Sequence, residues 1–174
     1  MAVSCDIRLN TQLSPDERAK FQDHFAIQEA LATAKVIAVV GLSTEATKAS
    51  NMVASYLKDE GFRVVPIHPK AESVLGETAY KSLRDVPFPI DIVDVFRPAG
   101  EVDQIVEDAV AIGAKAVWLQ LRIINMPAAE RARQAGLTTV VDRCIKMEHG
   151  RYSGRLHWAG MNTELISARR RQFA

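Results

Sequence analysis

A glycine that directly follows a short apolar run is the feature of this sequence with the clearest chemistry. Residues 36–40 are all β-branched or small apolar residues, which is typical of a strand covered on both faces. Gly41 ends this run, a polar loop follows, and apolar residues recur at helical spacing from Met52 onward. A strand, a glycine turn and a helix start together predict a phosphate-binding element, because backbone N–H groups and the positive end of the helix dipole point at one place.

This predicted element differs from two common nucleotide-binding loops. It has one glycine, so it is not the G-x-G-x-x-G of the usual NAD-binding folds. No G-K-[ST] closes it, as it would in a Walker loop. The loop therefore indicates a nucleotide ligand, but neither an ordinary NAD site nor an ATPase.

A cation stands at the end of the second predicted strand, where many NAD-binding folds have an acid. Residues 66–70 read Pro-Ile-His-Pro-Lys. In an NAD site, an Asp or Glu in this place accepts a hydrogen bond from the ribose 2′-OH. Lys70 instead suits an extra phosphate on the ribose, as in NADP or coenzyme A. The alternative interpretation of Lys70 is a solvated loop residue.

Phe96 and Arg97 follow the third predicted strand. An aromatic ring there is suited to cover an adenine, and a guanidinium is suited to bind a phosphate. Taken alone, a core Phe96 and a surface Arg97 are the simpler interpretation. Together with Gly41 and Lys70 at other strand ends of the same sheet, they favour a ligand site. Gln120, near the end of the fourth predicted strand, is expected to face the same pocket.

Strands and helices alternate along most of the chain. The predicted strands are 36–40, 62–68, 90–96, 114–121 and 138–141; the predicted helices are 14–34, with room for a break near Ala26, then 50–60, 98–113, 127–136 and 162–171. The crossovers are too long for hairpins, so the strands are expected to be parallel with right-handed connections. The fold class is therefore α/β: a Rossmann-like, doubly wound, parallel five-stranded sheet in the order 3-2-1-4-5, with its ligand at the carboxyl ends of the strands.

Several residues mark where the predicted helices begin and end. Ser14, Pro15 and Glu17 form a capping box with proline at the first helical position, and Ser50 is a candidate N-cap for the helix at 50–60. The predicted C-terminal stops are Gly61, Gly113 and Gly136. We divide the chain into an N-terminal extension with its helix (1–34), a binding domain (35–150) and a C-terminal extension packing on the same domain (151–174).

Composition excludes several classes of protein. The 174 residues carry a formal net charge of +1, which argues against a nucleic-acid binder. No apolar run approaches the roughly 20 residues of a membrane span, so no membrane partner is expected. Asp6 and Arg8 stand where a signal peptide would be apolar. Cys5 and Cys144 lie far apart in the sequence, which is typical of a reduced, cytoplasmic protein.

Four motifs in order carry a resemblance to a known family. V-G-L-S follows the first strand, I-H-P-K ends the second, P-x-D-I-V-D-V-F-R spans the third, and D-R-C-I-K-M-E-H follows the fifth. With these motifs the sequence resembles the small stand-alone CoA-binding-domain proteins, the YccU-like group, over about residues 30 to 170. The fold of this family is similar to the N-terminal CoA-binding domain of the succinyl-CoA synthetase alpha subunit.

The resemblance implies coenzyme A as the ligand, held by the first loop, by the lysine after the second strand and by the end of the third strand. One departure concerns the first loop: family members often carry prolines and an arginine there, whereas this chain has Glu45, an unfavourable neighbour for a pyrophosphate. The candidate binding residues are Gly41, Leu42, Ser43, Thr44, Lys48, Ser50, His68, Pro69, Lys70, Val95, Phe96, Arg97 and Gln120.

The resemblance also implies that the chain is not an enzyme. In the related synthetases a phosphorylated histidine and the acyl chemistry lie on other domains, and 174 residues are too few to hold them. We therefore expect non-catalytic binding of coenzyme A or an acyl-CoA. Two alternatives stay open: an NADP-dependent reductase, which Lys70 permits, and a nucleotide-sensing module that acts on a protein partner through the C-terminal segment.

The remaining reactive side chains give weaker signals. Cys144 follows Asp142-Arg143, and a neighbouring cation would lower a thiol pKa and make a nucleophile. A cysteine after a Val-Val strand is more often a small buried residue, which is the interpretation we favour. The histidines at 68, 149 and 157 do not share metal-ligand spacing, so no metal is expected. Trp118 is expected in the core.

Overall fold

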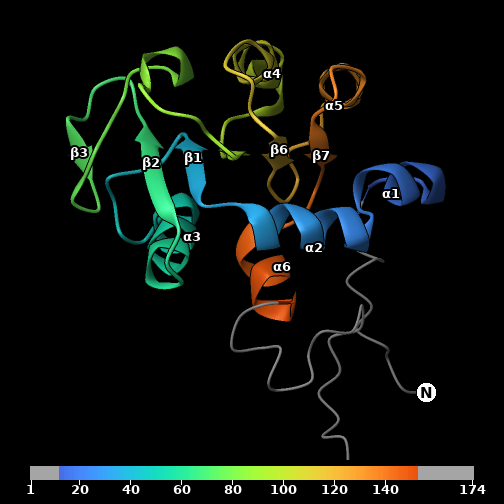
Figure 1. Ribbon diagram of the computed structural model, residues 1–174, viewed down its shortest axis with the longest axis horizontal. Coiled ribbons are helices and arrows are strands. Elements are labelled where there is room, and N and C mark those ends of the chain that lie inside the picture. Colours follow the sequence, from blue (N-terminus) through green and yellow to red (C-terminus); the bar gives the residue numbers. More distant parts are fainter. Residues whose placement is uncertain (1–11, 153–174) are drawn as a thin grey trace, which may run out of the picture.

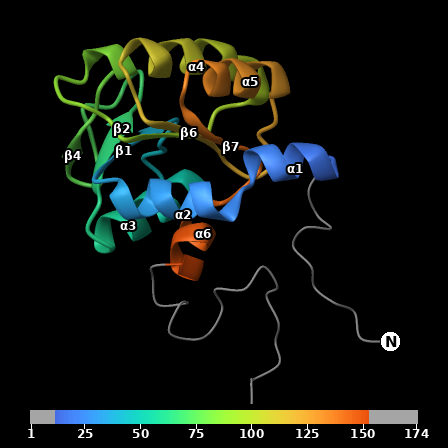
Figure 2. The same ribbon diagram turned by 45° about the vertical axis from the view of Figure 1, so that its right-hand side comes forward.

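Five parallel strands form one central sheet with helices on both faces (Figure 1, Figure 2). The structure is a computed structural model, and it describes residues 12–152; the helix predicted at 162–171 lies outside the described residues. The sheet consists of β1 (Val36–Val40), β2 (Arg63–Ile67), β5 (Ile92–Val95), β6 (Ala116–Leu119) and β7 (Thr138–Val140), in the order β2-β1-β5-β6-β7. Every neighbouring pair in it is parallel, which confirms the predicted doubly wound, Rossmann-like α/β fold.

The predicted strand order is wrong in the place of one strand. Counted along the chain, the five strands lie 2-1-3-4-5 and not 3-2-1-4-5, because β5 pairs with β1 and β6. All four residues of β5 are buried, whereas β2 begins with the exposed Arg63, as suits a central and an edge strand. Both orders arise from the same alternation of strands and helices, so the alternation alone does not distinguish them. The observed order places the topological switch point, where such sheets bind ligands, between the ends of β1 and β5.

The helices lie in two layers and are short. Their bounds are α1 (Pro15–Phe21), α2 (His24–Thr33), α3 (Ala49–Asp59), α4 (Val102–Ala111), α5 (Met126–Gln134) and α6 (Ile145–Tyr152), with 3₁₀ turns η2 (Leu83–Asp85) and η3 (Ala99–Glu101). The predicted stops Gly61, Gly113 and Gly136 follow α3, α4 and α5 with positive φ, as C′ glycines do. Within residues 12–152, none of these helices has the length and apolar character needed to cross a membrane.

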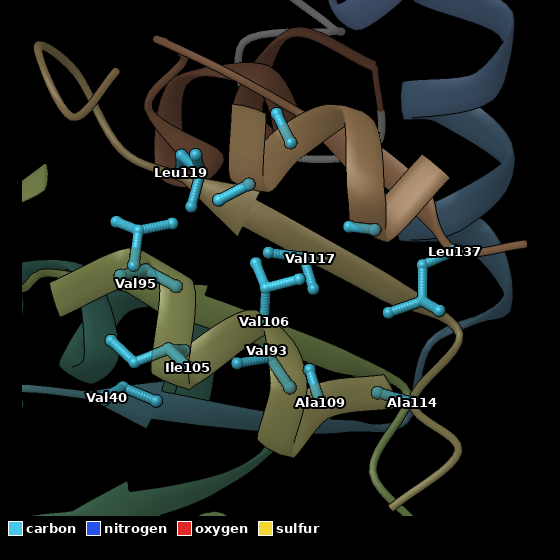
Figure 3. Close-up of a cluster of buried hydrophobic side chains, with 14 of the residues drawn as sticks. Val40, Val93, Val95, Ile105, Val106, Ala109, Ala114, Val117, Leu119 and Leu137 are labelled. Carbon is cyan, nitrogen blue, oxygen red and sulfur yellow. The ribbon is translucent and has the colours of Figure 1, made fainter. Parts of the chain in front are cut away.

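Alternating side chains of the sheet build two cores, one on each face. Ala38 and Val40 of β1 belong to the core under α4 and α5, while Ile37 and Val39 belong to the core under α2, α3 and α6. Figure 3 shows the first of these, with side chains of the sheet meeting those of α4. Because both faces are covered, the strands are apolar throughout instead of alternating, which is why they stand out in the sequence.

The predicted helix at 14–34 is two helices, and the break lies at Gln22–Asp23 instead of near Ala26. The side chain of Asp23 causes it, since its Oδ1 accepts a hydrogen bond from the Ala26 N–H at 2.8 Å and so caps α2. At the start of α1, the predicted capping box of Ser14 and Glu17 is confirmed. The break lets the two helices reach different parts of the molecule (Figure 1).

Two elements were not predicted. One is α6, which begins just after the D-R-C motif. The other is a small antiparallel hairpin of β3 (Ser73–Val74) and β4 (Glu77–Thr78), whose turn at Leu75 and Gly76 has positive φ at both residues. Such a two-residue turn matches the twist of a hairpin. Two-residue strands are too short to leave a periodic pattern.

Both edges of the sheet meet another segment of the chain. Beside β2, the His68 N–H donates to the Tyr80 carbonyl at 2.9 Å, and the Tyr80 N–H donates to the Pro66 carbonyl at 2.9 Å. Just after β7, the Val141 N–H donates to the carbonyl of Phe21, the last residue of α1, at 3.2 Å. Backbone groups at each edge are therefore already hydrogen-bonded within the chain.

Candidate functional site

The carboxyl ends of four neighbouring strands bring the predicted site residues together. Three backbone hydrogen bonds join them: the Gly41 N–H to the Ile67 carbonyl (3.1 Å), the Phe96 N–H to the Val40 carbonyl (2.9 Å) and the Gln120 N–H to the Val95 carbonyl (3.4 Å). The residues that follow β2, β1, β5 and β6 therefore lie side by side along one edge of the sheet, which we call the carboxyl edge.

Gly41 is a position that only glycine fits. Its φ is +85°, a conformation that L side chains rarely adopt. A Cβ built on Gly41 would also lie 2.7 Å from Cδ of Arg97 and 3.3 Å from the carbonyl oxygen of Phe96. The stem of the Arg97 side chain thus packs directly on the backbone at the start of the first loop.

The first loop is held by hydrogen bonds from its own side chains and from α3. The Ser43 N–H donates to Oγ of Ser50 at 3.0 Å, and the Ser43 carbonyl accepts from Nδ2 of Asn51 at 2.8 Å. Leu42 is fully buried, so its side chain serves the core. These contacts fix the course of the loop backbone, which is the part that a phosphate would meet.

The predicted role of Ser50 as helix N-cap is wrong. Helix α3 begins one residue earlier, at Ala49, with Lys48 in the cap position and no side-chain bond to the helix. Ser50 lies inside the first turn, where its hydroxyl accepts from the loop instead. Thr44 and Lys48 are exposed, and Nζ of Lys48 lies 3.8 Å from a carboxylate oxygen of Glu45. Glu45 therefore stands beside a cation of the same loop.

The segment after β2 turns sharply and carries its lysine outward. Nδ1 of His68 accepts hydrogen bonds from the N–H groups of Lys70 (3.1 Å) and Ala71 (2.9 Å). Pro69 and Lys70 are exposed. The histidine predicted as a ligand residue thus shapes the turn, and the lysine is presented to solvent at the carboxyl edge.

The end of β5 carries an aromatic ring and a paired cation. Phe96 is half-buried against the core on the α3 side of the sheet. Arg97 is exposed, and its guanidinium donates two hydrogen bonds to Glu101, from Nε to Oε2 at 2.8 Å and from Nη2 to Oε1 at 2.7 Å. The hydrogen bonds from Arg97 hold the pKa of Glu101 below its usual range. Glu101 was not among the residues predicted for this site, although its spacing of four residues from Arg97 is typical of a helical ion pair.

A buried polar cluster lies just below the carboxyl edge. Asp94, on β5, has no exposed surface; its Oδ1 accepts from Nε2 of Gln120 at 2.8 Å, and its Oδ2 has no hydrogen-bond partner among residues 12–152. Burial raises the pKa of Asp94 to about 7. Gln120 is itself buried, so its amide is turned into the protein and not toward an open pocket. In the sequence, the feature that could have indicated this cluster is an acidic residue inside an otherwise apolar strand.

Cys144 is next to this cluster and caps α6. Its sulfur accepts from the N–H groups of Met147 and Lys146, yet burial raises the pKa of the thiol overall, and the charge of Asp94 acts in the same direction. A thiol with a raised pKa is a poor nucleophile at neutral pH, which supports the structural interpretation of this residue. Trp118 is fully buried and donates from Nε1 to the Arg143 carbonyl at 2.7 Å, which confirms its place in the core.

No group of three or more His, Cys, Asp or Glu residues within positions 12–152 is arranged to hold a metal ion. His149 is 6% exposed and its Nδ1 lies 3.0 Å from the Tyr56 hydroxyl. That contact binds α6 to α3. The chemistry available at the edge is that of backbone N–H groups, a helix N-terminus, an aromatic ring and the exposed cations Lys48, Lys70 and Arg97, which suits a phosphorylated, aromatic ligand.

Comparison with known proteins gives a consistent result. Residues 35–150 match the model of a family described as a CoA binding domain. The Bacillus subtilis protein YneT, described as uncharacterized, is 36% identical over 123 residues, which make up 71% of this chain and 91% of YneT. A solved structure of a hypothetical protein from Pyrococcus horikoshii is 39% identical with a TM-score of 0.72, and the likeness covers 75% of this chain and 92% of that one.

A larger enzyme contains a similar region. The acetate–CoA ligase (ADP-forming) I of Archaeoglobus fulgidus is 26% identical in an alignment 123 residues long, which covers 65% of this chain. The same alignment covers only 18% of the ligase. The likeness is therefore to one region of that protein and not to the whole of it.

Proposed function

The chain belongs to the CoA-binding domain family, and from that premise we propose that it binds coenzyme A or an acyl-CoA at the carboxyl edge without catalysing a reaction. Membership confirms the resemblance that four sequence motifs predicted. The observation that carries the proposal is that Gly41, Lys70 and Arg97 follow the carboxyl ends of three adjacent strands, β1, β2 and β5, beside the switch point of the sheet.

The pyrophosphate, the adenine and the 3′-phosphate of coenzyme A each have a suitable partner at this edge. The pyrophosphate is assigned to the backbone N–H groups after Gly41 and to the N-terminus of α3, whose dipole favours an anion. The adenine is assigned to the ring of Phe96. The 3′-phosphate on the ribose is assigned to Lys70, which is exposed just beyond β2, where the ribose of a bound nucleotide lies in such folds.

The absence of catalysis is a proposal that rests on the state of the reactive groups. Asp94 and Gln120 are buried and bonded to each other, so neither is presented to a ligand. Cys144 has a thiol whose pKa is raised by burial. Acyl transfer needs an activated nucleophile or a correctly positioned acid and base. Asp94, Gln120 and Cys144 are not arranged to serve as either.

The sharpest test of the ligand uses Lys70 and one phosphate. We expect Lys70→Ala to weaken coenzyme A by roughly 10- to 150-fold, the worth of a charge-assisted hydrogen bond. Dephospho-CoA lacks the 3′-phosphate, so its affinity should hardly change. Titration calorimetry of both proteins with both ligands gives the four affinities that this comparison needs. Lys115→Ala is the matched control, because it removes the same charge from an exposed lysine at the opposite edge of the sheet.

Two outcomes would contradict the ligand assignment. Equal weakening of coenzyme A and dephospho-CoA would place Lys70 elsewhere than at the 3′-phosphate. Thermal stabilisation by NADP and none by coenzyme A would replace the proposal with the NADP-dependent reductase. At roughly 100 times the dissociation constant a ligand adds about 2.7 kcal/mol to stability, so the shift in melting temperature for the true ligand is on the order of 5–10 °C.

The proposed lack of catalysis has its own test. The protein is incubated with acetyl-CoA and with succinyl-CoA, with and without ATP, and free thiol is followed with a colour reagent. We expect no turnover above the background without protein. Turnover in the usual enzyme range of roughly 1 to 1000 per second that disappears in Cys144→Ala would show that this thiol is a nucleophile.

A further inference from the structure

We propose that Glu101 is an internal competitor of the ligand for Arg97, so that the ion pair between these two side chains limits the affinity of the carboxyl edge for a pyrophosphate. The inference rests on the proposed function of this edge and adds what sets its affinity. It concerns a residue outside the set of binding residues derived from the sequence.

The side chain of Arg97 passes close to the backbone of Gly41. Its Cδ and Cγ lie 2.7 Å and 3.2 Å from the position that a Cβ on Gly41 would take. The stem therefore crosses the start of the phosphate-binding loop, and the guanidinium at its end is within one side-chain length of that loop.

The guanidinium of Arg97 is held by Glu101. Two N–H groups of Arg97 bond the two carboxylate oxygens of Glu101 at 2.8 Å and 2.7 Å, in the parallel, bidentate arrangement. A phosphate uses the same two-pronged geometry on arginine. The Glu101 carboxylate thus occupies the Nε side of the guanidinium in the manner of a phosphate.

The ion pair between Arg97 and Glu101 is weak enough for a phosphate to replace the carboxylate. The side chains of Arg97 and Glu101 are 45% and 48% exposed, so water and salt weaken their attraction. Glu101 also stands at the start of α4, where the helix dipole stabilises its charge after Arg97 departs. A phosphate group with more negative charge is therefore a stronger partner for Arg97 than the carboxylate that it replaces.

A neighbouring acid provides the contrast. Asp103, two residues further along, is 49% exposed and pairs with Arg131 and Asn125 on the side of α5. It adds a similar negative charge near the same helix start but has another cation. The competition is therefore specific to Glu101, and a general effect of negative charge would include Asp103.

The test measures the affinity for coenzyme A in four variants by titration calorimetry at low salt. We expect Glu101→Gln to bind about 3- to 10-fold more tightly than the unchanged protein and Arg97→Gln to bind about 10-fold or more weakly. In the Arg97→Gln background, adding Glu101→Gln should have no effect, because the cation for which it competed is gone. Asp103→Asn should leave the affinity unchanged.

Two results would overturn the competition while leaving the proposed function intact. One is unchanged or weaker binding in Glu101→Gln, which would mean that Glu101 does not oppose the ligand or that it positions Arg97. The other is an equal gain in affinity for coenzyme A in Asp103→Asn, which would mean that any negative charge near this helix start weakens binding. If none of the proteins, unchanged or variant, binds coenzyme A, the proposed function fails and this inference fails with it.

Discussion

The two ends of β5 each carry an aspartate, and the protein treats them in opposite ways. At the amino end, Oδ2 of Asp91 accepts from the N–H groups of Lys35 (2.8 Å) and Val36 (2.9 Å), and Oδ1 pairs with Nζ of Lys115 at 2.8 Å. Near the carboxyl end, Oδ1 of Asp94 accepts from Nε2 of Gln120, and its second oxygen has no hydrogen-bond partner within the described part of the chain.

This difference separates the amino edge of the sheet from the carboxyl edge, where we propose that the ligand binds. Burial opposes ionisation of Asp91, but the bonds from Lys115 and from two backbone N–H groups outweigh it and lower the pKa. Burial of Asp94 is opposed by little and raises the pKa to about 7. At the amino edge the fold satisfies its own polar groups. At the carboxyl edge, the exposed Arg97 is held by an exchangeable partner, and the buried Asp94 just below the edge keeps one carboxylate oxygen without a hydrogen-bond partner among the described residues.

The largest expected effect is on stability, from Asp94→Asn. The native pKa of about 7 lies above the usual aspartate value of about 3.9, so the native state binds more protons between these values and loses stability as the pH rises through them. Asn keeps the shape without the charge. We expect the variant to be about 2–4 kcal/mol more stable at pH 8 and to lose this advantage by pH 4. Urea unfolding across this pH range measures the difference; parallel pH profiles of the two proteins would contradict it.

A smaller effect of opposite sign is expected from Asp91→Ala. The substitution leaves two backbone N–H groups and Lys115 without their acceptor, and we expect a loss of about 1–3 kcal/mol at pH 7. Because the native pKa is lowered, the carboxylate stabilises the fold above pH 4, and the deficit shrinks as the pH falls below the usual value of about 3.9. Affinity for coenzyme A should not change; a weaker ligand complex would mean that the two edges are not independent.

The smallest effect on stability is expected from Gly41→Ala. This substitution also tests the difference between the two edges of the sheet, because it is expected to change the affinity for the ligand. The strained φ alone should cost about 1 kcal/mol or somewhat more. The new methyl group also meets Arg97 at 2.7 Å, so affinity for coenzyme A should fall by about 10-fold. Gly61→Ala is the matched control: its φ is +96°, but a Cβ there has nothing within 4 Å. Equal binding in the two variants would show that Arg97 does not need its place on Gly41.

The positions of the carboxyl-edge residues were predictable because each stands at the end of an apolar run. Gly41, Lys70 and Arg97 follow three strands that the sequence marks clearly, and parallel strands bring their ends to one edge. The strand order was not predictable in this way. Whether β5 lies beside β1 or beyond β2 depends on pairing between residues far apart in the sequence, such as Ile37 and Ile92, and these apolar positions suit either neighbour.

Side-chain pairing at the edge was predictable only in part. The spacing of four residues between Arg97 and Glu101 predicts an ion pair. The same spacing is also compatible with an arginine that binds a ligand. Ser50 precedes a helical pattern as an N-cap would, and only the path of the loop shows that its hydroxyl bonds Ser43 instead. The orphaned oxygen of Asp94 depends on what surrounds it in three dimensions, which no local pattern encodes.

The contacts at the two outer strands have a consequence for how copies of this chain are able to meet. Open strand edges invite another chain to add a strand, which is the route to fibrous aggregates. Here the segment at Tyr80 occupies part of the β2 edge, and Phe21 takes the N–H just past β7. Pro66, within β2, has no N–H to offer a newcomer. Within residues 12–152, self-association by sheet extension is thus hindered at part of each margin.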